Sequence, residues 1–261
     1  MSLVQTSFED GVARVRLCRS EKRNALSRQL LTELAAAIRS LLAEDSVRVL
    51  ILEAEGTVFC AGMDLGEMQQ RATSDDGPAE WQQDSEDYCQ LLIDIYTAPV
   101  PTIAVLQGPV LAGGVGMVLA CDFVIASESA FVSLPEPQRG ITAAMVTPLL
   151  VHRIGAGPAS HLLLSGDRMT AARAEILGLV YRMVASDELG SATDSLVATI
   201  LKGSRDALAI TKLHVAQMAQ AEMLDKLRKS IAVSAEARAG EDAREGLAAF
   251  LEKRPPSWQP K

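Results

Sequence analysis

The feature that most constrains the fold is a glycine-rich turn within an apolar stretch, QGPVLAGGVGMVLACD, at residues 107–122. The run that leads into it, VPTIAVLQG, has the nearly continuous apolar pattern of a strand covered on both faces. We expect a helix after the glycines. A buried strand joined to a helix by a tight turn is typical of an α/β core. Glycines at a helix start also expose backbone N–H groups that no helical carbonyl accepts.

Strands and helices alternate through the first part of the chain. GVARVRLCR predicts a half-buried strand, and VRVLILEAEG and SAFVSLPE predict further strands. Ser27 and Thr170 are placed as N-caps of two predicted helices, the second running into YRMVA. The polar segment QQRATSDDGPAEWQQDSED predicts a loop that leads into the helix YCQLLIDIYTA.

From Asp187 onward the pattern is wholly helical, and two prolines end the last helix. We therefore predict a core over residues 1–200 and a helical region over residues 201–261.

Composition excludes several classes of protein. The net charge of −8 argues against nucleic acid or an anionic membrane as partner, because both select an excess of Lys and Arg. Apolar runs end well short of the ~20 residues that a membrane span needs. The sequence contains no CxxC pair of the kind that binds a metal. The four cysteines therefore indicate buried free thiols in a reducing compartment. Because the N-terminal residues do not have the pattern of a signal peptide, we expect a cytoplasmic protein.

The glycine turn lacks the residues of the common phosphate-binding loops. Gly108 and Gly113 have the separation of a Walker loop, but no Lys and Ser/Thr follow them. The order G-G-x-G, deep in the chain, also differs from a dinucleotide fingerprint. Two interpretations are left. The glycines allow close packing, or one of their N–H groups stabilises an oxyanion that forms on a carbonyl oxygen.

An oxyanion hole needs a second donor, and TVFCAGMDLGEM offers a candidate turn after the strand VRVLILEAEG. Together, FCAGMDL and QGPVLAGGVGMVLACDFVIASESAFVSLPE resemble the crotonase, or enoyl-CoA hydratase/isomerase, family. RNALS, LSGDRMTAARAEILGLV and REGLAAFLEKR extend the resemblance over nearly the whole chain. It implies an α/β fold, a crotonase-like spiral of β-β-α units. Within it, residues 1–200 would carry the acyl-CoA site. The helical C-terminal region, residues 201–261, would cover the pocket and drive assembly of a homotrimer or of a hexamer, a dimer of trimers.

The resemblance implies an acyl-CoA thioester as substrate, with coenzyme A as part of that substrate and no separate cofactor or metal. The thioester oxygen would lie between the backbone N–H groups of Met63 and Gly113, which stabilise the enolate charge. Phe250 and Lys253 would approach the site from a C-terminal helix of this or a neighbouring subunit. The implied substrate and coenzyme A site comprises Ala25, Ala61, Met63, Asp64, Leu65, Gly113, Gly114, Gly116, Pro135, Phe250 and Lys253.

Hydratases of this family use two glutamates, and this chain carries one of them. Glu136, in the Pro135-Glu136 pair, is the predicted acid or base, and an apolar pocket would raise its pKa towards the working pH. The position of the other glutamate is taken by Gly116. One carboxylate suits the Δ3,Δ2-enoyl-CoA isomerases and the hydratases of hydroxycinnamoyl thioesters. Hydration of a simple enoyl-CoA by two glutamates is correspondingly disfavoured.

Other functions stay open at this stage. A decarboxylase or thioester hydrolase could use the same fold, and a non-catalytic or RNA-binding role is the remaining alternative, against which the net charge counts. VTPLLVHRIG resembles the methylglutaconyl-CoA hydratase branch, and within it we interpret His152 as structural. We expect residues 67–86, taken as a loop, and the helices over the pocket to select the acyl group.

Overall fold

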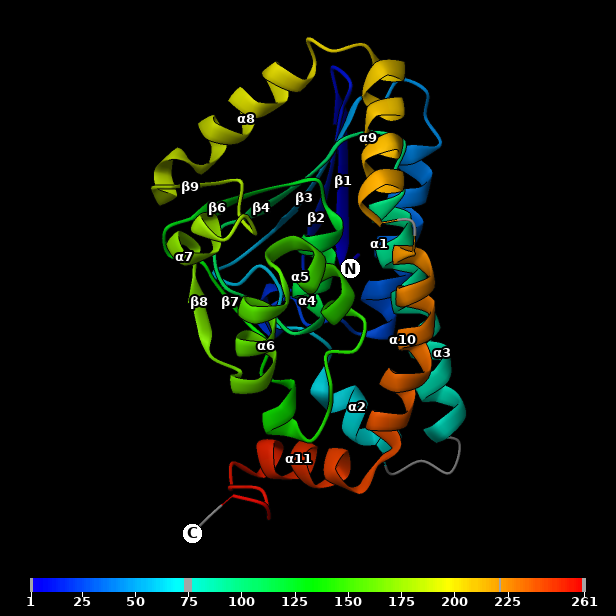
Figure 1. Ribbon diagram of the computed structural model, residues 1–261, viewed down its shortest axis with the longest axis vertical. Coiled ribbons are helices and arrows are strands. Elements are labelled where there is room, and N and C mark those ends of the chain that lie inside the picture. The colour runs from blue at the N-terminus through cyan, green and yellow to red at the C-terminus, as the bar shows by residue number, and fades with distance from the viewer. Residues whose placement is uncertain (1, 73–76, 221, 260–261) are drawn as a thin grey trace.

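A computed structural model describes residues 2–72, 77–220 and 222–259. Its main sheet has six strands in the order β1-β2-β3-β4-β6-β9 (Figure 1). β1 and β2 are antiparallel, and every later neighbour pair is parallel. The strands are β1 (Val4–Glu9), β2 (Val12–Leu17), β3 (Val49–Ala54), β4 (Thr102–Leu106), β6 (Phe123–Ser127) and β9 (Arg182–Val184).

Both faces of the central strands are covered, as their continuous apolar sequences predict. Alternate residues enter two separate cores, because successive side chains of a strand point to opposite faces. Leu50 and Leu52 of β3 join the larger core, which contains α1, α3 and α4. Val49 and Ile51 join a smaller core against α8. Helix α8 lies over this second face of the sheet (Figure 1).

A second, three-stranded sheet brings the glycine turn next to the Pro-Glu pair. β5 (Val110–Leu111) pairs in parallel with β7 (Phe131–Ser133), and β7 pairs with antiparallel β8 (Arg168–Thr170). The turn follows β5 directly, and Pro135 follows β7 after one residue. The carboxyl ends of parallel neighbours meet at one edge of a sheet, so two motifs more than 20 residues apart become adjacent.

Helices form the rest of the molecule, and two of them have the predicted N-caps. Ser27 and Thr170 cap α1 and α7 by accepting from the N–H of Leu30 and Arg173, which confirms both predicted caps. The longer helices are α1 (Arg28–Leu42), α2 (Leu65–Ala72), α3 (Gly77–Tyr96), α4 (Gly113–Ala120), α5 (Val146–Ile154), α6 (Ala156–Ser165), α8 (Leu189–Ile200), α9 (Arg205–Gln220), α10 (Met223–Ala239) and α11 (Glu241–Glu252). The shorter ones are η1 (Ser20–Lys22), η2 (Glu136–Arg139), α7 (Ala171–Ile176) and η3 (Ser186–Glu188).

The segment interpreted as a polar loop is mostly helical, so that expectation was wrong. Its residues belong to α2 and α3, and only residues 73–76 of it lie outside the described part. Polar side chains of α3 such as Gln82 and Glu86 face solvent, while Trp81, Ser85 and Tyr88 face inward at helical spacing. The helical pattern was therefore present but diluted by the polar face. The prediction of helix into YRMVA also fails, because Arg182–Val184 form β9.

The C-terminal helices return to the body of the protein. α10 packs along α3, and α11 crosses beside α2 and η2 at one end of the molecule (Figure 1). α9 is held at its middle by Lys212, whose Nζ lies 2.8 Å from Asp122 and donates to the Val100 carbonyl at 3.0 Å. Asp122 also accepts from the N–H and the hydroxyl of Thr102. These contacts fix the start of β4 and the end of α4 to the helical region.

The Ser27 cap should have a measurable effect on stability. Replacing it, as Ser27→Ala, leaves the N–H of Leu30 without its acceptor and should lower the free energy of unfolding by about 1 kcal/mol. The control is Ser40→Ala, on the exposed side of the same helix, which should change stability by less than about 0.5 kcal/mol. Urea unfolding measures both. Equal effects of the two substitutions would contradict the cap.

Candidate active site

Two loops are joined by backbone hydrogen bonds so that their ends lie together. Phe59 N–H donates to Pro109 O, and Leu111 N–H donates to Cys60 O, each at 2.9 Å. The contact needs glycine at residue 62: a Cβ there would clash with Ala112 and lie 3.4 Å from the Gly113 nitrogen. The loop after β3 and the start of α4 therefore form one rigid unit.

This unit presents two unpaired backbone donors. Leu26 donates its N–H to the carbonyl of Gly62 and accepts from the N–H of Asp64. The N–H of Met63, which lies between these two residues, therefore has no partner in this pairing. The N–H of Gly113 is at the first position of α4, where no helical carbonyl reaches it. Neither N–H has an acceptor among the described residues. The structure thus brings together the two predicted oxyanion donors.

Ala112 just before Gly113 has an unusual backbone conformation. Its φ is 51° and its ψ is −129°, outside the region that side chains usually allow. Such a residue costs on the order of 1–3 kcal/mol and persists only where the surrounding structure enforces it. Here the enforcing contacts are the hydrogen bond from Ala112 N–H to Ser133 O and the loop pairing. This strained turn aims the first N–H groups of α4.

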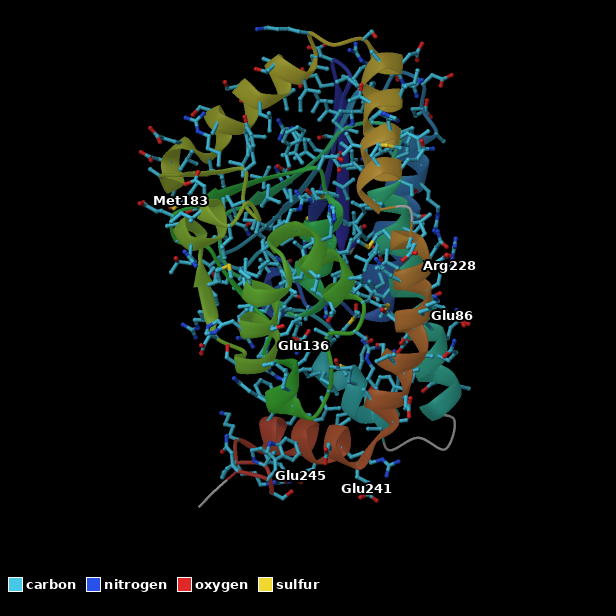
Figure 2. All side chains as sticks on the ribbon, viewed as in Figure 1. Glu86, Glu136, Met183, Arg228, Glu241 and Glu245 are labelled. Carbon is cyan, nitrogen blue, oxygen red and sulfur yellow. The ribbon has the colours of Figure 1, made fainter. Side chains whose placement is uncertain are left out.

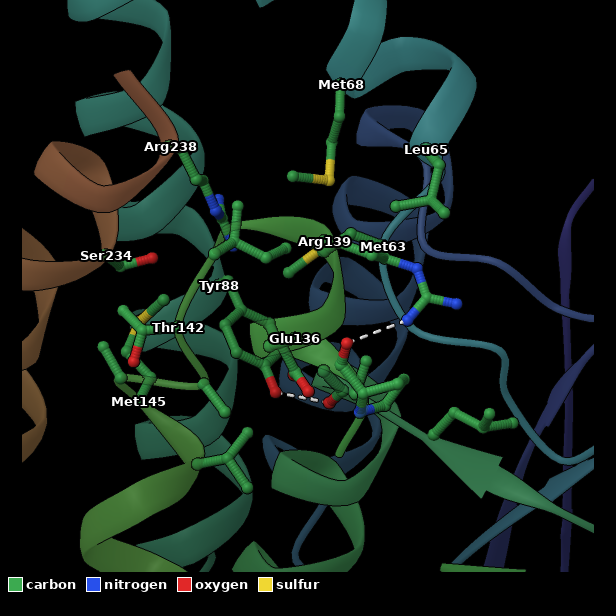
Figure 3. A pocket seen from close by; sticks show the side chains of 18 of the residues that line it. Met63, Leu65, Met68, Tyr88, Glu136, Arg139, Thr142, Met145, Ser234 and Arg238 are labelled. Carbon is green, nitrogen blue, oxygen red and sulfur yellow. Dashed lines mark hydrogen bonds between the residues drawn. The ribbon is translucent and has the colours of Figure 1, made fainter. Parts of the chain in front are cut away.

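A pocket of about 70 Å³ opens beside these donors (Figure 3). Of the predicted site residues, the following line it: Ala61, Met63, Leu65, Gly113, Pro135 and Glu136. Further walls come from α3, from residues 141–146 and from α10. Most lining side chains are apolar, and the charged exceptions are Glu136, Arg139 and Arg238.

Glu136 lies inside the molecule, unlike Glu86, Glu241 and Arg228 at its surface (Figure 2). Only 5% of its surface is exposed, and its Oε2 is buried with no hydrogen-bond partner among the described residues. Burial raises its pKa to about 7, against the lowering effects of its own backbone N–H, Arg139 and Arg238. A carboxyl group with this pKa can both accept and donate a proton near neutral pH.

The other predicted site residues lie outside the pocket lining. Gly114 packs on Cys60, where a Cβ would come within 2.9 Å of the sulfur. Asp64 pairs with Arg19 at 2.7 Å and accepts from N–H groups in the first turn of α2, and the Ala25 carbonyl accepts from the same arginine. Asp64 therefore holds the loop of Met63 in place.

Of the two residues predicted on the last helix, Phe250 contacts a lining residue of the pocket. Phe250 of α11 stacks under the Arg139 guanidinium of the same chain, at 4.5 Å from the ring centroid. Lys253 is the exposed C-cap of that helix.

Gly116 lies behind the pocket wall, against a residue that the sequence reading missed. A Cβ at this position would overlap the hydroxyl of Tyr88 and lie 3.3 Å from the ring carbon that carries it. Tyr88 is 2% exposed, lines the pocket and donates a hydrogen bond to the carbonyl of Gly113 (Figure 3). A tyrosine hydroxyl thus occupies the space into which a side chain at residue 116 would extend.

Burial keeps that hydroxyl protonated, because it raises the pKa of Tyr88 well above the usual value. Among the described lining residues, Glu136 is therefore the single carboxyl group. The described residues also hold no cluster of metal-ligating side chains, and no described helix has the length and apolarity to cross a membrane.

Comparisons with known proteins identify the family of the chain. Residues 7–261 match the enoyl-CoA hydratase/isomerase family, so the chain belongs to this family. The chain is 33% identical over 259 residues to the enoyl-CoA hydratase domain-containing protein 2, mitochondrial, of Mus musculus, covering 97% of this chain and 86% of that one. It is 31% identical over 255 residues to the methylglutaconyl-CoA hydratase, mitochondrial, of Mus musculus, covering 95% and 80%.

A solved structure confirms the predicted fold. An enoyl-CoA hydratase/isomerase from Xanthobacter autotrophicus Py2 is similar to this chain, with a TM-score of 0.88 and 30% identity over 100% of this chain and 99% of that one. The molecule therefore has the crotonase fold, a mixed α/β architecture with a helical C-terminal region.

The raised pKa of Glu136 predicts a pH-dependent stability. The folded chain holds the proton more tightly than the unfolded chain, whose carboxyl group has a pKa of 4.5. The stabilisation is fully present below that pH and is lost as the pH rises through about 7. Between pH 4 and pH 8 the wild type should lose about 3 kcal/mol of unfolding free energy relative to Glu136→Gln.

Urea unfolding of both proteins at the two pH values measures this difference. Glu86→Gln, at an exposed position, is the control and should follow the wild type. Parallel stability curves for the wild type and Glu136→Gln would show that Glu136 ionises as it does in water.

The contact between residue 116 and Tyr88 predicts an energetic coupling. Gly116→Ala should destabilise the wild type by about 1–3 kcal/mol through overpacking against the hydroxyl. In a Tyr88→Phe background the cost should fall by at least about 1 kcal/mol, because the overlapping oxygen is gone. A double-mutant cycle of unfolding free energies gives the coupling. Additive effects would mean that the hydroxyl does not fill this space.

Proposed function

We propose that this protein moves a proton on the acyl chain of an enoyl-CoA thioester, with Glu136 as the acid and base. The observation that carries the proposal is a single buried carboxyl group with a pKa of about 7 in a pocket that also presents two unpaired N–H donors. The thioester oxygen accepts from Met63 and Gly113. The apolar walls exclude water, so both donors act in a low-dielectric surrounding.

The best-supported reaction is isomerisation of a 3-enoyl to a 2-enoyl thioester. Oε2 of Glu136 takes a proton from Cα, and the electron pair of that C–H bond enters a dienolate whose charge rests on the thioester oxygen. The double bond moves from C3–C4 to C2–C3, and Glu136 returns the proton to C4. One carboxyl group completes the cycle, which fits a pocket whose described lining has no second one.

Hydration of a 2-enoyl thioester is the second candidate. Its support is the same pKa of about 7, since Glu136 could deprotonate a water and then protonate Cα. Absorbance separates the two reactions, because hydration removes the conjugated double bond and isomerisation creates it. Release of free thiol without either change would instead indicate a thioester hydrolase.

Removing the carboxyl group should abolish the reaction. Glu136→Gln should lower kcat for isomerisation of a short 3-enoyl-CoA by ~10²–10⁴-fold, the usual contribution of acid–base catalysis. In the wild type, kcat/KM should rise about tenfold per pH unit below about pH 7 and level off above it, since only the carboxylate accepts the proton.

Steady-state rates from pH 5 to pH 9 measure both effects, with Glu86→Gln as a control that should keep wild-type rates. Unchanged turnover in Glu136→Gln would refute the role given to this residue.

We also propose that the chain assembles as a homotrimer, or as a dimer of trimers. α9 supports this, because Ile210, Leu213 and Met218 each expose more than half of their surface along one helix. Monomeric proteins rarely leave such apolar patches uncovered. A particle of about three or six times 27.9 kDa in sedimentation would agree with this assembly.

A further inference from the structure

The pocket contains a buried cation that the proton transfer does not use. Arg238 belongs to the last turn of α10, is 8% exposed and lines the pocket. Figure 3 shows its side chain entering from α10, on the side of the pocket away from Leu65. Sequence reasoning could not single it out, because the arginine lies in an ordinary helical segment.

The guanidinium has no acceptor among the described residues. It forms no hydrogen bond and no ion pair with them, and its contact is the face of Trp81, 5.8 Å from the ring centroid. The nearest available carboxylate is already shared. Asp84 binds Arg28 through one oxygen at 2.7 Å and Arg71 through the other at 2.8 Å. The hydroxyl of neighbouring Ser234 pairs with that of Ser85.

A buried guanidinium whose N–H groups have no acceptor is costly, so its retention calls for a partner. Burial lowers the pKa of Arg238, yet a guanidinium stays protonated in proteins. Arg139, the other cation of the lining, donates from Nη1 to the Pro135 carbonyl and stacks on the Phe250 ring, while its buried Nε has no partner among the described residues. Glu136 supplies no direct ion pair to either arginine in the described part of the chain. Arg238 therefore keeps unused N–H donors on the pocket lining, although the charges of Asp84 and Glu136 lie close enough to act on it.

We propose that Arg238 binds a carboxylate at the far end of the acyl group, so that the substrate is the coenzyme A monothioester of an unsaturated dicarboxylic acid. This inference rests on the proposed function, because it assumes that the thioester lies between Met63 and Gly113. A planar guanidinium with unused donors matches a carboxylate, which it can bind through two parallel hydrogen bonds. The carboxylate would also supply the acceptors that the guanidinium lacks among the described residues.

Binding of saturated thioesters tests the proposal without relying on turnover. Calorimetry compares the coenzyme A monothioesters of butanedioic, pentanedioic and hexanedioic acid with those of butanoic, pentanoic and hexanoic acid. We expect the best diacid to bind the wild type roughly 30-fold or more tightly than the monoacid of equal length, the usual scale for a buried charge pair. No preference for any diacid in the wild type would overturn the proposal.

Variants then assign the preference to Arg238. Arg238→Met should lower the ratio of diacid to monoacid affinity roughly 30-fold, and Arg238→Lys should retain part of it. The matched control is Arg228→Met, an exposed arginine of the same helix, which should keep the wild-type ratio. A ratio unchanged in Arg238→Met would mean that Arg238 serves the fold, Glu136 or a phosphate of coenzyme A, and would refute the carboxylate site.

The outcome separates this proposal from the proposed function. If the diacid preference depends on Arg238 but Glu136→Gln turns over enoyl thioesters normally, the carboxylate site stands and the catalytic assignment fails. If Glu136→Gln is inactive and the wild type shows no diacid preference, the proton transfer stands and the carboxylate site fails.

Discussion

The short backbone pairing between the loop after β3 and the segment before α4 determines the rest of the site. Two hydrogen bonds, from Phe59 to Pro109 and from Leu111 to Cys60, align these loops. Gly62 allows their close approach, and the conformation of Ala112 turns the chain into α4. The N–H groups of Met63 and Gly113 are left free by this arrangement. Backbone donors held in this way need no reorganisation when charge develops on a bound carbonyl.

The second constraint is the burial of Glu136. Because the pocket walls are mostly apolar, the carboxyl group has a pKa near neutrality and exchanges protons readily. Tyr88 fills the space in front of Gly116 and leaves the described lining with one carboxyl group. We propose isomerisation on this basis, since a single group can remove a proton and return it. Arg238 adds a charge that proton transfer does not require, which points to the acyl group itself.

Features encoded by local sequence could be predicted. The buried strands, the caps at Ser27 and Thr170 and the motifs of Met63, Gly113 and Glu136 each occupy a few adjacent residues, so pattern and resemblance sufficed. The fold followed from these motifs. Residues whose role depends on packing between distant helices were missed, because no short motif surrounds them.

Tyr88 and Arg238 are the clearest cases. Both come from helices that look polar in sequence, and each reaches the pocket only because α3 and α10 pack side by side. The spacing of Trp81, Ser85 and Tyr88 could have revealed the inward face of α3, since it repeats at helical period. Nothing comparable marks Arg238. Its significance comes from the acceptors it lacks, which only the tertiary structure shows.

The most direct test of the account is deuterium uptake at Cα of a short 3-enoyl-CoA in D₂O, followed by nuclear magnetic resonance. Proton removal at Cα is the step that we propose for the free N–H groups and Glu136, and this measurement detects it without regard to the final product. The account predicts uptake with the wild type and its loss in Glu136→Gln. Equal rates of uptake in the two proteins, or none in the wild type, would contradict it.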